Sequence, residues 1–151
     1  MAHANKLFIE AATVAVLCYI AYIDFRTFKI RNESLILLLV LYVVYALLAR
    51  SSYEILSNVL FGAVMFGILL FFYARKLIGG GDVKLLSIAC LWVDMHCALL
   101  FSAALLTFII LHVAAVSIRW VGTNRIEGRR GIPYAPSIAG ALITLILLGC
   151  A

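Results

Sequence analysis

The sequence predicts an all-α membrane protein with six transmembrane helices and both termini on the outer side of the membrane. Three observations support this fold class: the apolar composition, a series of six apolar segments, and the placement of basic residues between them. Hydrophobic residues make up 66% of the 151 residues and charged residues 13%, whereas charged residues are about a quarter of a soluble domain. Too few polar side chains remain to cover a soluble enzyme. No repeat or second domain is visible, so we expect residues 1–151 to form a single transmembrane domain.

The apolar segments follow one another with short polar links. They cover residues 7–23, 35–49, 55–74, 85–93, 97–118 and 135–151. A helix needs about 20 apolar residues to cross a bilayer, so the fourth segment is too short to cross unaided. Its helix is expected to begin earlier, beside the glycines that precede Asp82. In a five-span alternative, Asp94 and His96 would be buried within one long helix.

The basic residues decide between these alternatives. The links after the first, third and fifth segments are strongly basic and hold Arg26, Lys29, Arg31, Arg75, Lys76, Lys84, Arg119, Arg125, Arg129 and Arg130. The other links and termini hold only Lys6, Arg50 and the turn at residues 94–96. Six spans place all three basic links on one face, which the positive-inside rule makes cytoplasmic. The net charge of +5 is therefore a topology signal, and no nucleic-acid partner is expected.

Two carboxylates lie at one membrane depth in this topology. Asp24 closes the first segment and Asp82 opens the fourth, both on the cytoplasmic side. An ionisable side chain at a helix–membrane boundary is costly unless it is paired, hydrated or functional. Two carboxylates that face each other do not both ionise readily, so one stays protonated while the other is an anion. An aspartic peptidase uses this arrangement to activate water and protonate the scissile carbonyl, without a metal or a cofactor.

Two other classes of protein fit part of this pattern. A small ion- or proton-coupled transporter could use the same carboxylates. Transporter sites lie near the bilayer midplane, however, whereas Asp24 and Asp82 lie near one face. A non-enzymatic assembly subunit with the same fold would be expected to have lost one of the two carboxylates, and this sequence keeps both.

The residues around Asp82 suit a peptide substrate. Gly79, Gly80 and Gly81 are poor helix formers and allow an irregular backbone and close approach of another chain before the fourth helix. A peptide could lie against them, although glycines alone are also typical of a flexible turn. Lys84 either contacts the substrate or the carboxylate pair, or extends its ammonium group to the membrane interface.

These motifs resemble those of the type IV prepilin peptidases, which are intramembrane-type aspartic peptidases. Residues 79–85, Gly-Gly-Gly-Asp-Val-Lys-Leu, are similar to the family's G-x-G-D signature and its usual extension. Residues 20–32, in which Asp24 precedes a basic stretch and Ile30-Arg-Asn32, look like its first catalytic segment. Residues 131–140 are similar to the segment before its last helix. The resemblance covers most of the chain.

The resemblance implies a bacterial or archaeal inner-membrane endopeptidase in which Asp24 and Asp82 are catalytic. Its substrates would be prepilins or pseudopilins, whose short basic cytoplasmic leaders are cut just before the hydrophobic helix. Long family members carry a cytoplasmic insertion with paired C-x-x-C motifs and methylate the new N-terminus. This sequence has neither feature, which indicates the short, peptidase-only branch found with Tad/Flp-type pilus systems. The expected partners are a pilin precursor and membrane lipids.

The remaining polar residues and the cysteines receive structural interpretations. Asp94 and His96 are expected to form an outer turn, and Glu10 is expected to be an interfacial or helix-contact residue about 20 Å from Asp24. Residues 128–131 are interpreted as a solvated cytoplasmic loop. No cysteine pair has C-x-x-C or zinc spacing. All four cysteines are therefore expected to be small hydrophobic residues: Cys18, Cys90, Cys97 and Cys150.

Overall fold

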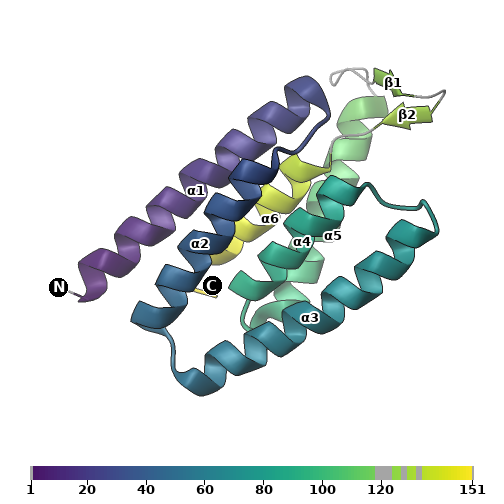
Figure 1. The fold of residues 1–151 in the computed structure, drawn as a ribbon. Helices are drawn as coiled ribbons and strands as arrows, with labels where there is room; N and C mark the ends of the chain where they lie inside the picture. The colour runs from purple at the N-terminus through teal and green to yellow at the C-terminus, as the bar shows by residue number, and fades with distance from the viewer. Residues whose placement is uncertain (1, 118–123, 127–128, 132–133, 151) are drawn as a thin grey trace.

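The computed structural model describes residues 2–117, 124–126, 129–131 and 134–150 as a bundle of α-helices with a small hairpin at one end (Figure 1). In chain order the elements are α1 (Ala2–Thr27), α2 (Asn32–Ala49), α3 (Ser52–Ala74), α4 (Gly80–Trp92), the 3-10 helix η1 (Met95–Cys97), α5 (Ala98–Ser117), β1 (Asn124–Ile126), β2 (Arg129–Gly131) and α6 (Ala135–Leu147). Each of the six apolar segments thus forms a helix. The fourth helix begins beside the glycines, as expected, and η1 interrupts the single helix that the five-span alternative requires.

Helix length separates the bundle into two groups. Four stretches are long and apolar enough to cross a membrane: Lys6–Thr27, Asn32–Ala49, Ser52–Ala74 and Met95–Ala115. By contrast, α4 and α6 have 13 residues each, which gives about 20 Å of helix against a hydrocarbon core of about 30 Å. The four long stretches support a multi-pass membrane protein, with α4 and α6 as shorter helices among them.

Local sequence determines where the long helices begin and end. Ser51 and Glu54 form a capping box at the start of α3, in which the N–H of Ser51 donates to Glu54 Oε2 at 2.7 Å and the N–H of Glu54 donates to Ser51 Oγ at 3.3 Å. This box satisfies two amides that would otherwise lack partners. α1 ends where Phe28 adopts a φ of 54° and its N–H donates to the carbonyl oxygen of Asp24 at 2.8 Å. The chain then returns as α2, so the end of α1 and the start of α2 lie at the same end of the bundle (Figure 1).

The short helices α4 and α6 form the centre of the bundle. α4 packs against α2, α3 and α6, while α6 packs against α1, α4 and α5. Among the largest fully buried side chains are Leu85 and Trp92 of α4 and Leu142 and Leu145 of α6. The long helices α3 and α5 bury little of their surface and expose large apolar side chains. Such side chains suit contact with lipid tails, which are as apolar as leucine.

The structure is all-α apart from a short hairpin in the polar link before α6. In this antiparallel hairpin, Asn124 pairs with Gly131 and Ile126 pairs with Arg129. Two residues separate the strands, and the second is Gly128, a spacing typical of β-hairpins. The loop expected over residues 128–131 is thus corrected for residues 129–131, which form β2. Residues 118–123 and 127–128 lie outside the described residues.

Two of the four cysteines are not the small hydrophobic residues that the spacing suggests. Cys97, at the end of η1, forms a disulfide with Cys150, which follows α6. The pairing depends on how α5 and α6 pack, and the spacing of the cysteines along the chain does not reveal it. Cys18 and Cys90 are free thiols within helices, exposed on α1 and buried in α4.

Candidate active site

The first carboxylate, Asp24, lies in the last turn of α1 and is buried, with 4% of the residue exposed. Its Oδ2 accepts a hydrogen bond of 3.2 Å from the backbone N–H of Ala135, the first residue of α6. The first amides of a helix have no partner within that helix, and the helix dipole adds partial positive charge there. Asp24 therefore caps α6 from a distant part of the sequence, through a hydrogen bond that is strongest to a carboxylate anion.

The second carboxylate, Asp82, lies in the first turn of α4 and is partly buried. Its side chain folds back toward the N-cap residue Gly79. The two are so close that a Cβ added to that glycine would lie 3.0 Å from Asp82 Oδ2. Asp82 is close enough to Asp24 for the two side chains to interact electrostatically. The structure thus brings together two residues that the sequence places at one depth.

A cavity of about 210 Å³ opens beside Asp82. Side chains from the α3–α4 link, α4, α5 and the start of α6 line it: Leu77, Ile78, Asp82, Leu86, Leu105, Ile109, Tyr134 and Ile138. Tyr134, which lines the cavity, directly precedes Ala135, whose N–H binds Asp24. A volume of this size holds several water molecules, so water has space next to Asp82.

The two carboxylates have different surroundings. Asp82 lines a mostly apolar cavity, whereas Asp24 accepts a hydrogen bond from the N-terminus of a helix. Two carboxylates whose environments differ are typical of a general acid and a general base that act together. Among the described residues, no group of three His, Cys, Asp or Glu side chains is placed to hold a metal ion. The chemistry that this arrangement offers is proton transfer to and from a bound water.

The glycines before the second carboxylate allow close packing of helices. Gly79 is the N-cap of α4 with an extended backbone, whereas Gly80 and Gly81 already belong to the helix. This corrects the expected irregular stretch. A Cβ at Gly80 would lie 3.2 Å from Cε2 of Tyr73, and a Cβ at Gly81 would lie 3.3 Å from Cβ of Ile30. The absence of side chains therefore lets the start of α4 approach α3 and the α1–α2 link closely.

Lys84 is directed to a different neighbour. Its Nζ donates to Asn32 Oδ1 at 3.1 Å, and both residues line a separate cavity between α2 and α4. This contact ties the start of α4 to the start of α2. The hydrogen bonds of the described residues include none between Lys84 and either carboxylate.

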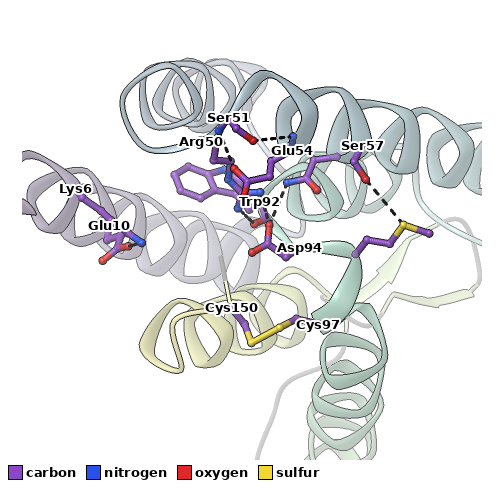
Figure 2. Close-up of polar contacts among 12 residues, drawn as sticks. Lys6, Glu10, Arg50, Ser51, Glu54, Ser57, Trp92, Asp94, Cys97 and Cys150 are labelled. Carbon is purple, nitrogen blue, oxygen red and sulfur yellow. Dashed lines mark hydrogen bonds and ion pairs between the residues drawn. A yellow bond between two sulfur atoms is a disulfide. The ribbon is translucent and has the colours of Figure 1, made fainter. Parts of the chain in front are cut away.

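A polar cluster lies at the opposite end of the bundle, and it was not among the sites that the sequence predicts. Arg50, directly after α2, forms an ion pair with Asp94, and its Nη2 donates to the carbonyl oxygen of Trp92 at 2.9 Å (Figure 2). Asn58 Nδ2 donates at 3.4 Å to Asp94 Oδ1, the oxygen that also pairs with Arg50. The expected turn at Asp94 and His96 is present as η1 and its N-cap. The sequence signal for this ion pair was the opposite charge of the links that follow α2 and α4.

Glu10 and the residues at the start of α6 complete the comparison with the sites expected from the sequence. Glu10 pairs with Lys6 on the same helix, with 3.6 Å between Nζ and Oε1 (Figure 2), so it lies well away from Asp24 along α1. Near the carboxylates, Tyr134 and Ala135 are not among the site residues that the sequence predicts. Ala135 contributes only its backbone N–H, and a main-chain donor leaves no sequence signal beyond its position at a helix start.

Comparison with known proteins identifies a family for this chain. The profile of the type IV leader peptidase family matches residues 11–118, a range that includes both Asp24 and Asp82. Neither the curated proteins nor the solved structures gave a significant match. The family match supports a peptidase with a prepilin-type protein substrate. Because the match covers well over half of the sequence, the chain belongs to the type IV leader peptidase family.

Proposed function

We propose that the chain is an aspartic endopeptidase of the inner membrane that removes the short basic leader of type IV prepilins or pseudopilins. The observation that carries this proposal is that Asp82 lies within electrostatic range of Asp24 and lines a cavity at one end of the bundle. Family membership supports the peptidase activity and the class of substrate. The carboxylate pair supports the aspartic mechanism.

The surroundings of the carboxylates suggest how the roles divide. Asp24 is the anion and general base, because the N–H of Ala135 donates to its Oδ2. Asp82 holds the proton and is the general acid, because the cavity that it lines is mostly apolar and Asp24 carries the negative charge of the pair. Gly79, Gly80 and Gly81 shape the site by keeping the start of α4 in place.

Each step of the reaction then moves protons between these groups. Asp24 takes a proton from a bound water, whose oxygen attacks the scissile carbonyl carbon while Asp82 gives its proton to the carbonyl oxygen. A neutral gem-diol results. When the C–N bond breaks, Asp24 returns its proton to the leaving amine and a hydroxyl of the gem-diol reprotonates Asp82. The pair ends in its starting state, with no covalent intermediate.

The proposed orientation places this site on the cytoplasmic side, with six spans and both termini outside. The links at the carboxylate end carry Arg26, Lys29 and Arg31 after Asp24, and Arg75 and Lys76 after α3. At the other end, the basic residue that follows α2 is Arg50, which Asp94 neutralises. This asymmetry supports a cytoplasmic carboxylate end, which is where prepilin leaders lie.

Two narrower statements belong to the same proposal. The chain is a single peptidase domain of the short Tad/Flp-type branch, because its sequence lacks the insertion and the C-x-x-C pairs of methylating members. A transporter is less well supported, because the family match is to peptidases.

Leader removal in cells tests the proposal directly. The chain is coexpressed with a type IV prepilin, and cleavage is followed as a size shift on a gel. Asp24→Asn and Asp82→Asn should each lower the rate of cleavage by about 10²- to 10⁴-fold, the usual effect of losing an acid or base. If either variant cleaves at the wild-type rate, the two-carboxylate mechanism is wrong.

Glu33→Gln provides the matched control. Glu33 lies at the start of α2 at the same end of the bundle, but its side chain is largely exposed and pairs with Arg31. The same chemical change there should leave cleavage unchanged. Immunoblots of the membrane fraction confirm that all three variants insert in equal amounts.

A further inference from the structure

The bond between Cys97 and Cys150 joins two helix ends that are far apart in the sequence. The Cα atoms of the two cysteines are 5.9 Å apart, within the usual range for disulfides. Figure 2 shows the bond beside Asp94, near the Arg50 ion pair. Both cysteines are only partly buried, so a protein that exchanges disulfides has access to them.

The end of α6 is built to present Cys150 at this position. Gly149 adopts a φ of 72°, which suits glycine, and its N–H donates to the carbonyl oxygen of Ile146 at 3.1 Å. The N–H of Cys150 donates to the carbonyl oxygen of Leu145 at 2.9 Å, which completes a Schellman turn. The carbonyl oxygen of Cys150 in turn accepts from the N–H of Asp94 at 3.4 Å. The backbone thus already holds the two segments together where the sulfur atoms meet.

We propose that Cys97 and Cys150 are a disulfide site that is oxidised on the extracytoplasmic side of the membrane. The step is an exchange with a protein disulfide oxidant of that compartment. Two thiols lose two protons and two electrons and form the S–S bond, and the oxidant's disulfide is reduced to a dithiol. The cytoplasm keeps thiols reduced, so the inference rests on the orientation in the proposed function, which puts residues 97 and 150 outside.

The disulfide fixes the C-terminal end of α6, and the N-terminal end of the same helix donates a hydrogen bond to Asp24. α6 runs from Ala135, whose N–H binds Asp24, to the turn that carries Cys150. Its length of about 20 Å separates the disulfide from the candidate active site. The disulfide therefore secures α6 against α5 without taking part in proton transfer.

Counting free thiols tests the inference on the native full-length chain. Thiols in whole cells are trapped with acid, and the denatured protein is then treated with a maleimide–polyethylene glycol reagent that adds visible mass for each free thiol. Two tags are expected without reductant, on Cys18 and Cys90, and four after reduction. Four tags without reductant would overturn the disulfide.

Variants and host strains separate the remaining possibilities. Cys97→Ser should give three tags with or without reductant, whereas the control Cys18→Ser should give one tag before reduction and three after it.

Cells that lack the extracytoplasmic thiol oxidant should yield four tags without reductant, and two tags in those cells would overturn the assignment of the compartment. Reduction should also lower the Tm of the wild-type protein in detergent but not that of Cys97→Ser. The thiol count does not depend on leader removal, so failure of this inference is distinguishable from failure of the proposed function.

Discussion

Replacing Gly79 with alanine tests whether leader removal depends on the position of the Asp82 carboxylate. Gly79 has a φ of −70° and a ψ of 143°, values that alanine adopts without strain, so the added methyl group is the main change. That methyl carbon would lie 3.0 Å from Asp82 Oδ2, and a contact this short requires the neighbour to move by a few tenths of an ångström. Since that neighbour is the proposed general acid, the substitution disturbs the reacting group itself.

The size of the effect follows from this displacement. A misplacement of about 1 Å in a catalytic group can cost about 10²-fold in rate. A few tenths of an ångström should therefore lower kcat about tenfold, or about 1.4 kcal/mol in activation free energy. Alanine is also a poorer N-cap than glycine by about 0.5 kcal/mol, which is too little to unfold the protein.

The assay uses purified protein in detergent and a prepilin substrate, with kcat and KM measured from time courses of cleavage. Gly67→Ala is the matched control, because a Cβ at Gly67 would meet nothing within 4 Å and alanine favours the interior of α3 by about 0.5–1 kcal/mol. The control should cleave at the wild-type rate. If Gly79→Ala also does so, the packing of Gly79 against the carboxylate does not constrain catalysis, and the reasoning from this contact is refuted.

Three more substitutions or treatments separate positioning from chemistry. Lys84→Met removes the hydrogen bond to Asn32 and should cost about 1 kcal/mol of stability while kcat stays unchanged; a loss as large as that of Asp82→Asn would show that Lys84 takes part in the reaction. Arg50→Met should lower the free energy of unfolding by about 1–3 kcal/mol, measured by thermal unfolding in detergent, because Asp94 and the carbonyl of Trp92 lose their donor. The folded fraction should keep its kcat, and unchanged stability would contradict the ion pair. EDTA should leave the cleavage rate unchanged, because the proposed steps move protons between carboxylates and water; activity that EDTA removes and Zn²⁺ restores would establish a metal.

The positions of the helices, and the placement of Asp24 and Asp82 at the same end of the bundle, were predictable from the sequence. Apolar length determines where a helix crosses, and the basic links determine which helix ends share a face. These two rules place the end of the first helix and the start of the fourth at one depth, and the electrostatic influence of Asp24 on Asp82 agrees with that placement. The start of α4 beside Gly79 also followed, since residues 85–93 are too short to form the whole helix.

The contacts that the sequence did not predict all depend on how helices pack against one another. The N–H of Ala135 reaches Asp24 only because α6 lies against α1. Cys97 meets Cys150 only because α6 lies against α5. Lys84 turns to Asn32 because it lies on the face of α4 that packs against α2. Hydropathy and charge determine the depth of a residue in the membrane, but they do not determine the direction in which its side chain points.

If the proposed function holds, the short central helices place the carboxylates where a leader peptide meets its hydrophobic helix. α4 and α6 are about 10 Å shorter than the hydrocarbon core. The ends of these helices that lie away from the carboxylates are held in place, α4 by the bond from Arg50 to the carbonyl of Trp92 and α6 by the disulfide of Cys150. In the proposed orientation the missing length therefore falls at the cytoplasmic end, and we expect the start of both helices to lie below the membrane surface. A substrate then reaches Asp82 through the cavity, at the depth where its chain passes from the polar leader to the apolar helix. The bond at that junction is the one that a leader peptidase must cut.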